Sequence, residues 1–130
     1  LADLMRRFAI CEEKGSGVAK VIQAIELHQL PAPDFRAGFK RCSVVLLAPR
    51  GFEAMDRNDR VRACYQHCCL RYVLHEKMTN QSLRERFKLP EARADTASQI
   101  ISATLAAGLI RLDNASVGSR RYARYQPFWG

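Results

Sequence analysis

Three helical patterns, separated by breaks, follow one another in the second half of the chain, and they constrain its fold most strongly. Apolar residues recur with the 3.6-residue helical period over residues 58–75. Thr79 is a good N-cap for a short second helix, which Pro90 stops. A third helix is predicted from residue 93 or 95 to 107, and Gly108 is placed for the C′ position. Three such helices predict a compact trihelical core.

The residues after the third helix alternate between apolar and polar side chains. Residues 109–112 and 121–125 each predict a short strand, and a polar loop that contains glycine joins them. Three helices followed by a two-stranded ribbon is the element order of a winged helix. We therefore expect a winged helix-turn-helix domain over residues 56–130.

The third predicted helix has one apolar and one polar face. At 100° per residue, the apolar side is centred on Ala97 and Ile101. The opposite face holds small and polar residues, namely Asp95, Thr96, Gln99, Ser102, Ala103 and Ala106. The Gln99 carboxamide could read adenine bidentately, and Ser and Thr hydroxyls contact base edges or phosphates. This helix is the predicted reader of the DNA major groove.

Positive charge is the second argument for a nucleic-acid partner. The chain has 21 Lys and Arg residues against 13 Asp and Glu residues, a net charge of +8, which favours a polyanionic partner. The third helix has no Lys or Arg after Arg93, so phosphate contacts must come from its neighbours. The predicted DNA-binding residues are Arg84, Arg86, Lys88, Arg93, Thr96, Gln99, Ser102, Arg120, Arg121 and Arg124.

The first part of the chain is a less complete unit. Its apolar spacing predicts a helix over residues 4–11, a second helix over 18–30 and a strand over 39–47. Two helices and one strand cannot close a core alone. We therefore expect an α+β chain in which residues 1–50 form a small α/β remnant. This remnant would lean on the second half, on a partner chain or on upstream residues, and we expect a homodimer that completes or covers it.

Short motifs along the chain resemble one bacterial family. The segments EEKGSGV (residues 12–18), LPAPDF (30–35) and LAP (47–49) resemble the C-terminal part of RecG-helicase-related transcriptional regulators, which typically carry an N-terminal Alba/Schlafen-type domain. The segments TNQSLRERF (79–87) and RYARY (121–125) look like the winged helix that often ends those proteins. The resemblance implies an ATPase-like, RecG-related region followed by a DNA-binding domain. The chain has no Met at position 1, so we expect it to be a piece of a longer regulator.

Gly15, Ser16 and Gly17 precede the second predicted helix, and they are also similar to the final glycine box of the gyrase and histidine-kinase ATPase fold. In such a box, backbone N–H groups at a helix start meet phosphates, and Lys20 could add charge. The boxes that hold magnesium and adenine in that fold are absent from this sequence. A helix-entry turn that needs positive φ is the favoured explanation of the glycines, and an ATP-dependent regulator stays an alternative.

Four residues, Cys64, His67, Cys68 and Cys69, form the cluster that most resembles a metal site. Cys64 and Cys68 lie on the apolar stripe of their predicted helix, where free cysteines usually pack in a core, and His67 is predicted to point off that stripe. Core packing is therefore favoured over zinc. No Gly-x-Ser-x-Gly elbow and no coherent catalytic set is found. We expect no metal, no cofactor and no enzymatic activity.

An odd number of cysteines, five, without a regular framework favours a reducing cytoplasm. The longest apolar run, residues 44–48, is far shorter than the ~20 residues of a membrane span, and no membrane partner is expected. The leading hypothesis is a transcriptional regulator that binds double-stranded DNA. The alternative is a winged helix used for protein docking or dimerisation, with DNA or nucleotide binding in upstream domains.

Overall fold

A computed structural model describes residues 17–113 and 123–130 of the chain. Over these residues it has four α-helices, two short 3-10 helices and two antiparallel two-stranded sheets, which confirms the predicted α+β class. The elements in chain order are α2 (Gly17–Leu27), β1 (Asp34–Gly38), β2 (Arg41–Val45), η1 (Phe52–Ala54), α3 (Arg57–Val73), α4 (Asn80–Phe87), η2 (Glu91–Arg93), α5 (Ala94–Ala106), β3 (Ile110–Leu112) and β4 (Tyr125–Pro127).

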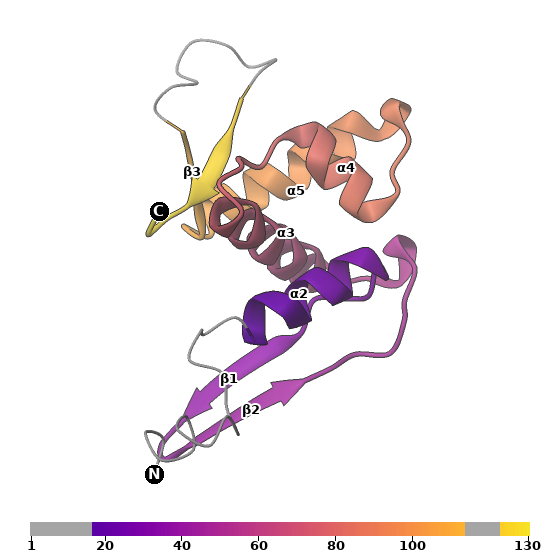
Figure 1. Cartoon of the computed structure of the whole chain (residues 1–130). Helices are drawn as coiled ribbons and strands as arrows, with labels where there is room; N and C mark the ends of the chain where they lie inside the picture. The colour runs from indigo at the N-terminus through magenta and orange to yellow at the C-terminus, as the bar shows by residue number, and fades with distance from the viewer. Residues whose placement is uncertain (1–16, 114–122) are drawn as a thin grey trace.

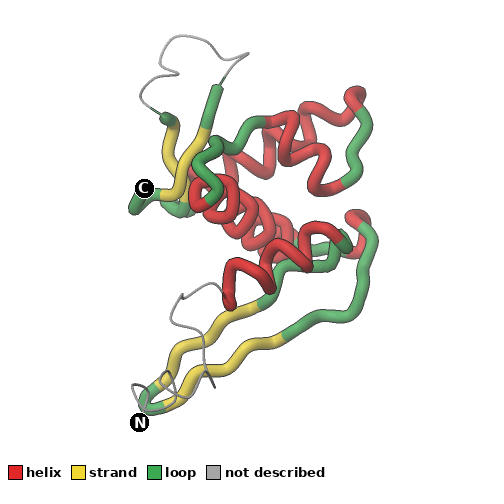
Figure 2. The backbone as a smooth tube through the Cα atoms, viewed as in Figure 1, coloured by secondary structure: helices red, strands yellow, loops and turns green. Residues whose placement is uncertain are grey.

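Helix α3 lies at the centre of the molecule (Figure 1). Helices α4 and α5 and the β3–β4 sheet pack on one side of it, and α2 with the base of the β1–β2 hairpin lies on the other. The hairpin extends away from the helices, as the backbone tube also shows (Figure 2). No helix in the described ranges is both long enough and apolar enough to cross a membrane.

The core forms where α3, α4 and α5 meet. Cys64 and Cys68 of α3 are fully buried beside Met78, whose sulfur lies 3.9 Å from the Cys64 sulfur. Ala97 and Ile101 of α5 pack into the same cluster. The predicted core role of the two cysteines is confirmed, since both of their side chains are withdrawn from water. Burial raises the pKa of the Cys64 thiol to about 12 and also raises that of Cys68.

Local signals set the helix ends as the sequence predicts. The Thr79 side chain accepts a hydrogen bond from the Ser82 backbone N–H, and the Ser82 hydroxyl accepts one from the Thr79 N–H in return. This reciprocal pair is a capping box, which satisfies two donors that the first turn leaves free. Beyond α5, Gly108 has a φ of 69°, the left-handed conformation expected at C′.

The strand predicted over residues 39–47 is confirmed in part as β2, but the prediction missed its partner β1 and therefore the hairpin that the two strands form. β1 pairs with β2 in a register that sets Phe35 opposite Val44 and Gly38 opposite Arg41. The turn lies at Phe39 and Lys40, inside the predicted strand. Sequence reasoning missed β1 because the nearby prolines and glycine indicated a loop.

The second sheet also differs from the prediction in its return strand. β3 pairs with β4 so that Ile110 faces Pro127 and Leu112 faces Tyr125. Within the described residues, the return strand spans 125–127, so it shares only Tyr125 with the predicted strand over 121–125, whose first two residues are outside the described ranges. Tyr125 also forms a β-bridge with Met78, which ties this sheet to the segment between α3 and α4. That bridge joins residues far apart in sequence, and no local pattern reports it.

The segment after α2 fastens the first part of the chain to α3. The Gln66 side-chain amide donates to the Pro33 carbonyl at 2.6 Å, and Arg62 Nε donates to the Ala32 carbonyl at 3.3 Å. Pro31, Ala32 and Pro33 are buried. The first part of the chain was expected to pack against the second half, a partner chain or upstream residues. These contacts show that it packs against the second half.

Candidate nucleic-acid interface

Helix α5 turns a face of small and polar side chains to solvent. Ala97, Ile101 and Thr104 are buried against α3 and α4, and the Thr104 hydroxyl donates to the Ile100 carbonyl at 2.8 Å. Thr96, a predicted DNA contact, is half-buried. The outward residues that are exposed, which we call the outer face of α5, are Asp95, Ser98, Gln99, Ser102 and Ala106. Their short side chains leave room for a second molecule to come close to the helix backbone.

Two surface grooves run beside the outer face of α5. One, of about 630 Å³, lies between the face and the start of α3, where Arg57 forms part of its wall. The other, of about 610 Å³, lies between α4, α5 and the residues before β4, and its walls include Arg84 and Arg124. Arginines therefore border the outer face on both of its long sides. Sequence reasoning missed Arg57, because it is the first residue of a neighbouring helix.

A side-chain relay connects α4 to α5 in the second groove. Asn80 Nδ2 donates to the Ala94 carbonyl at 3.0 Å and to the Ser98 hydroxyl at 2.9 Å. Arg84 Nε donates to Asn80 Oδ1 at 3.0 Å. The relay holds Arg84 beside the outer face. Neither Asn80 nor Ser98 was among the predicted site residues, and the sequence signals only that Asn80 is close to a helix cap.

The remaining predicted basic residues are placed differently from one another. Lys88 is exposed at the C-cap of α4, and Arg124 is exposed just before β4. Arg93 forms an ion pair with Glu53 and lies over the Phe52 ring, 5.3 Å from its centroid. The hydrogen bond and charge of Arg93 lower the pKa of the Glu53 carboxyl. Arg120 and Arg121 lie outside the described residues, as do the predicted helix over residues 4–11 and the first two residues of the Gly15–Gly17 turn.

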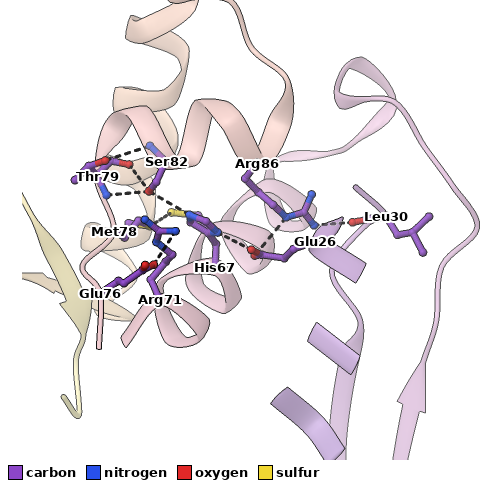
Figure 3. A network of polar contacts seen from close by, with 10 residues as sticks. Glu26, Leu30, His67, Arg71, Glu76, Met78, Thr79, Ser82 and Arg86 are labelled. Atoms are coloured by element: carbon purple, nitrogen blue, oxygen red, sulfur yellow. Dashed lines mark hydrogen bonds and ion pairs between the residues drawn. The ribbon is translucent and has the colours of Figure 1, made fainter. Parts of the chain in front are cut away.

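Arg86, a predicted phosphate contact, is buried and faces away from the outer face of α5. Its Nη2 donates to the Leu30 carbonyl at 2.6 Å, and its Nε lies 3.3 Å from Glu26 Oε1 (Figure 3). Arg84 and Arg86 are two positions apart on one helix, so they point to nearly opposite sides. Arg86 is therefore an internal ion-pair partner of α2, and we leave it out of the candidate interface.

His67, which was predicted to point off the apolar stripe of its helix, belongs to the same buried network. Its Nδ1 lies 2.8 Å from Glu26 Oε2, and its Nε2 lies 3.1 Å from the Ser82 hydroxyl (Figure 3). The ring thus joins α2 to the capping box of α4. Helical periodicity placed His67 off the apolar stripe, but it could not show that α2 covers that side of α3. In the part of the chain that the structure describes, no three His, Cys, Asp or Glu residues gather as a metal site.

The outer face and its two grooves suit a polyanion that also offers hydrogen-bonding base edges, as duplex DNA does. Hydroxyl and carboxamide groups on α5 both donate and accept hydrogen bonds, whereas the arginines beside them only donate. Asp95, in the first turn, is the acidic residue of the face, and a carboxylate there can accept from a cytosine amino group. Hydrogen-bonding side chains without positive charge lie along the middle of the face, and arginines lie on both sides of it. This arrangement matches a DNA groove, in which base edges lie between two phosphate backbones.

Comparison with known proteins bears on the first part of the chain. Residues 1–46 match a family model described as "Putative ATP-dependent DNA helicase recG C-terminal". No curated protein and no solved structure matches the chain. The matched residues include α2 and the β1–β2 hairpin and end before α3 begins. The chain therefore contains a RecG-related region over residues 1–46.

Proposed function

We propose that this chain is the DNA-binding part of a transcriptional regulator and that α5 enters the major groove of duplex DNA. The observation that carries the proposal is the outer face of α5, which holds polar side chains and one carboxylate but no cation, with arginines along both sides. We interpret α3, α4, α5 and the β3–β4 sheet as a winged helix, because that element order presents its third helix to DNA. The RecG-related region supports a place in a larger regulator.

Each group has a distinct role in this proposal. Gln99 contacts base edges, and Ser98 and Ser102 contact base edges or phosphates, because these side chains are exposed and offer donors and acceptors. Arg57 and Arg84, on opposite sides of the helix, contact the two phosphate backbones. Lys88 and Arg124 add further positive charge. The reading face without cations and its positively charged borders predict that most of the affinity depends on salt.

Fluorescence anisotropy with random duplex DNA at several salt concentrations tests the proposal. If three or four basic side chains meet phosphates, log K against log salt should have a slope of roughly −3. Replacing Arg57, Arg84 and Arg124 together by Ala should flatten that slope. The matched control replaces Arg36, Lys40 and Arg41 of the hairpin, which removes three positive charges away from α5. Undetectable binding at low salt would contradict DNA binding.

The exposed apolar face of the hairpin favours a second candidate function, homodimerisation. Phe35, Ala37, Cys42 and Val44 share one face of the β1–β2 sheet, and Val44 remains 47% exposed. Two strands alone are marginally stable in water, so a second copy would stabilise the sheet by covering this face. A homodimer would also place two copies of α5 on one duplex.

Light scattering at micromolar concentration tests the homodimer. We expect a mass of two chains, and we expect Val44→Lys to shift it toward one chain because a charge would be buried between the copies. Leu27→Lys is the matched control, since Leu27 is 78% exposed on α2 and outside the hairpin. A wild-type chain that stays monomeric excludes the dimer but leaves DNA binding by one copy intact.

A transcriptional regulator of this kind would act in the bacterial cytoplasm. The described cysteines, Cys42, Cys64, Cys68 and Cys69, are free thiols, which suits a reducing compartment. The proposed binding role requires no catalytic step, no metal and no cofactor.

A further inference from the structure

The groove between α4, α5 and the residues before β4 has two arginines in its walls. Arg84 enters from α4 and Arg124 from the approach to β4, and the described residues that line the groove include no carboxylate. Hydroxyls of Ser98 and Ser102 form the α5 side. The groove is therefore positive and rich in donors, which is the environment that a phosphate group requires.

Asn80 connects this groove to both helices, and its orientation follows from chemistry. An arginine only donates hydrogen bonds, so the atom of Asn80 that meets Arg84 Nε must be the carbonyl oxygen, at 3.0 Å. A backbone carbonyl only accepts, so the Asn80 amide nitrogen must face the Ala94 carbonyl, also at 3.0 Å. The same nitrogen donates to Ser98 Oγ, which leaves the Ser98 O–H group able to donate into the groove.

The relay restrains the guanidinium of Arg84 before any ligand arrives. Its Nε donates to Asn80, and its two Nη groups form no hydrogen bond or ion pair with another described residue. A guanidinium that is held in advance loses less side-chain entropy on binding an anion. Arg124, exposed on the opposite wall, supplies a second positive charge.

We infer that this groove is the seat of one backbone phosphate of bound DNA, with Arg84 and Arg124 as its charged contacts and Asn80 as the residue that positions Arg84. The inference rests on the proposed function and adds a specific site to it. A phosphate accepts from several donors at once, which matches the two arginines and the serine hydroxyls of this groove.

A double-mutant cycle on the full 130-residue chain tests the inference, with anisotropy on random duplex DNA as the measurement. Arg84→Ala should weaken binding by roughly tenfold, as expected for a charge-assisted hydrogen bond. It should also make the salt slope shallower by about 0.9. Arg41→Ala, which removes a charge from the distant hairpin, should change the affinity by less than about twofold, a small effect typical of screened, distant charges.

Asn80→Ala should weaken binding severalfold in the wild-type background and have little effect once Arg84 is Ala. Equal losses in the two backgrounds would overturn the positioning role, because Asn80 would then act through α5 alone. Arg84→Lys keeps the hydrogen bonds from Asn80 to α5. It is the substitute test if Asn80→Ala has a lower melting temperature than the wild-type chain. It should weaken binding with an unchanged salt slope, since charge is kept but the fixed fork is lost.

The wild-type titration separates failure of this inference from failure of the proposed function. A wild-type chain that does not bind DNA removes both. If the wild-type chain binds DNA but Arg84→Ala binds as tightly as Arg41→Ala, only the phosphate site is contradicted. Arg124→Ala tests the second arginine separately and should also weaken DNA binding. An unchanged affinity for that variant would show that Arg124 does not contact the phosphate.

Discussion

At the scale of single residues, a buried charge depends on its neighbours for its stability, as the network of Glu26, His67 and Arg86 shows. The Arg86 side chain is 3% exposed, and burial lowers the pKa of its guanidinium while the Glu26 carboxylate opposes that shift. Glu26 Oε2 also lies 2.8 Å from His67 Nδ1, and the other ring nitrogen, Nε2, lies 3.1 Å from the Ser82 hydroxyl. One carboxylate on α2 therefore holds a cation on α4 and orients a ring on α3.

Glu26→Gln should destabilise the chain by about 2–4 kcal/mol, because it leaves Arg86 buried without a counter-charge. Urea unfolding measures the loss. The matched control is Glu76→Gln, which breaks an ion pair with Arg71 whose carboxylate side is 48% exposed. The free energy of unfolding of that variant should fall by less than about 1 kcal/mol. Equal losses for both variants would show that Glu26 does not support a buried charge.

The cysteines offer a second test at the scale of single residues. Cys64 and Cys68 are buried and their thiol pKa values are raised, so both should stay protonated and unalkylated at about pH 8 in the folded chain. Cys42 is exposed on β2 in the single chain and should react first among the described cysteines in a monomeric sample, whereas the proposed homodimer would cover it. Peptide mapping after iodoacetamide treatment measures each site, with a urea-unfolded sample as the control. Early labelling of Cys64 would contradict the packing of α3.

At the scale of elements, helices and their ends followed from the sequence more closely than strands did. The predicted helices over residues 58–75 and 93–107 agree with α3 and α5 within two residues at each end, because caps and the 3.6-residue period are local signals. Strand pairing depends on a partner elsewhere in the chain. For that reason β1 was missed, and β4 extends two residues beyond the predicted end of the return strand.

The end of α5 yields a prediction with a closely matched control. Gly108→Ala should destabilise the chain by about 1 kcal/mol, because its φ of 69° disfavours any residue with a Cβ. No atom lies within 4 Å of the added methyl group, so the cost comes from the backbone alone. Gly51→Ala also adds a methyl group in open space, but at a negative φ, and should be neutral or slightly stabilising. Equal melting temperatures for the two variants would contradict this account.

At the scale of the whole molecule, the described parts should unfold together. α2 buries Ile22 and Ile25 and shares a carboxylate with α3 and α4, so the RecG-related region has no separate core of its own within the described residues. Fluorescence of the single tryptophan, Trp129, reports the side of α3 near Tyr72. Its urea transition should coincide with the far-UV circular dichroism transition. Two separated transitions would mean that the two parts of the chain fold independently.

The sequence by itself determined the three central helices, the Thr79 N-cap, the Gly108 C′ position, the buried cysteines and the polar side of α5. Each of these depends on residues within a few positions of one another, where helical geometry decides which side chains share a face. Periodicity also placed Arg84 and Arg86 on α4, but it could not say which of them would reach solvent.

Only the tertiary structure decided how those faces are used. Glu26 meets His67 across 41 positions, and Leu30 meets Arg86 across 56, so α2 buries one arginine while Asn80 holds the other beside α5. The hairpin pairing and the position of Arg57 beside α5 are likewise results of packing. The physical reason is that a helix period assigns a residue to a face, whereas contacts between distant segments decide whether that face meets protein or water.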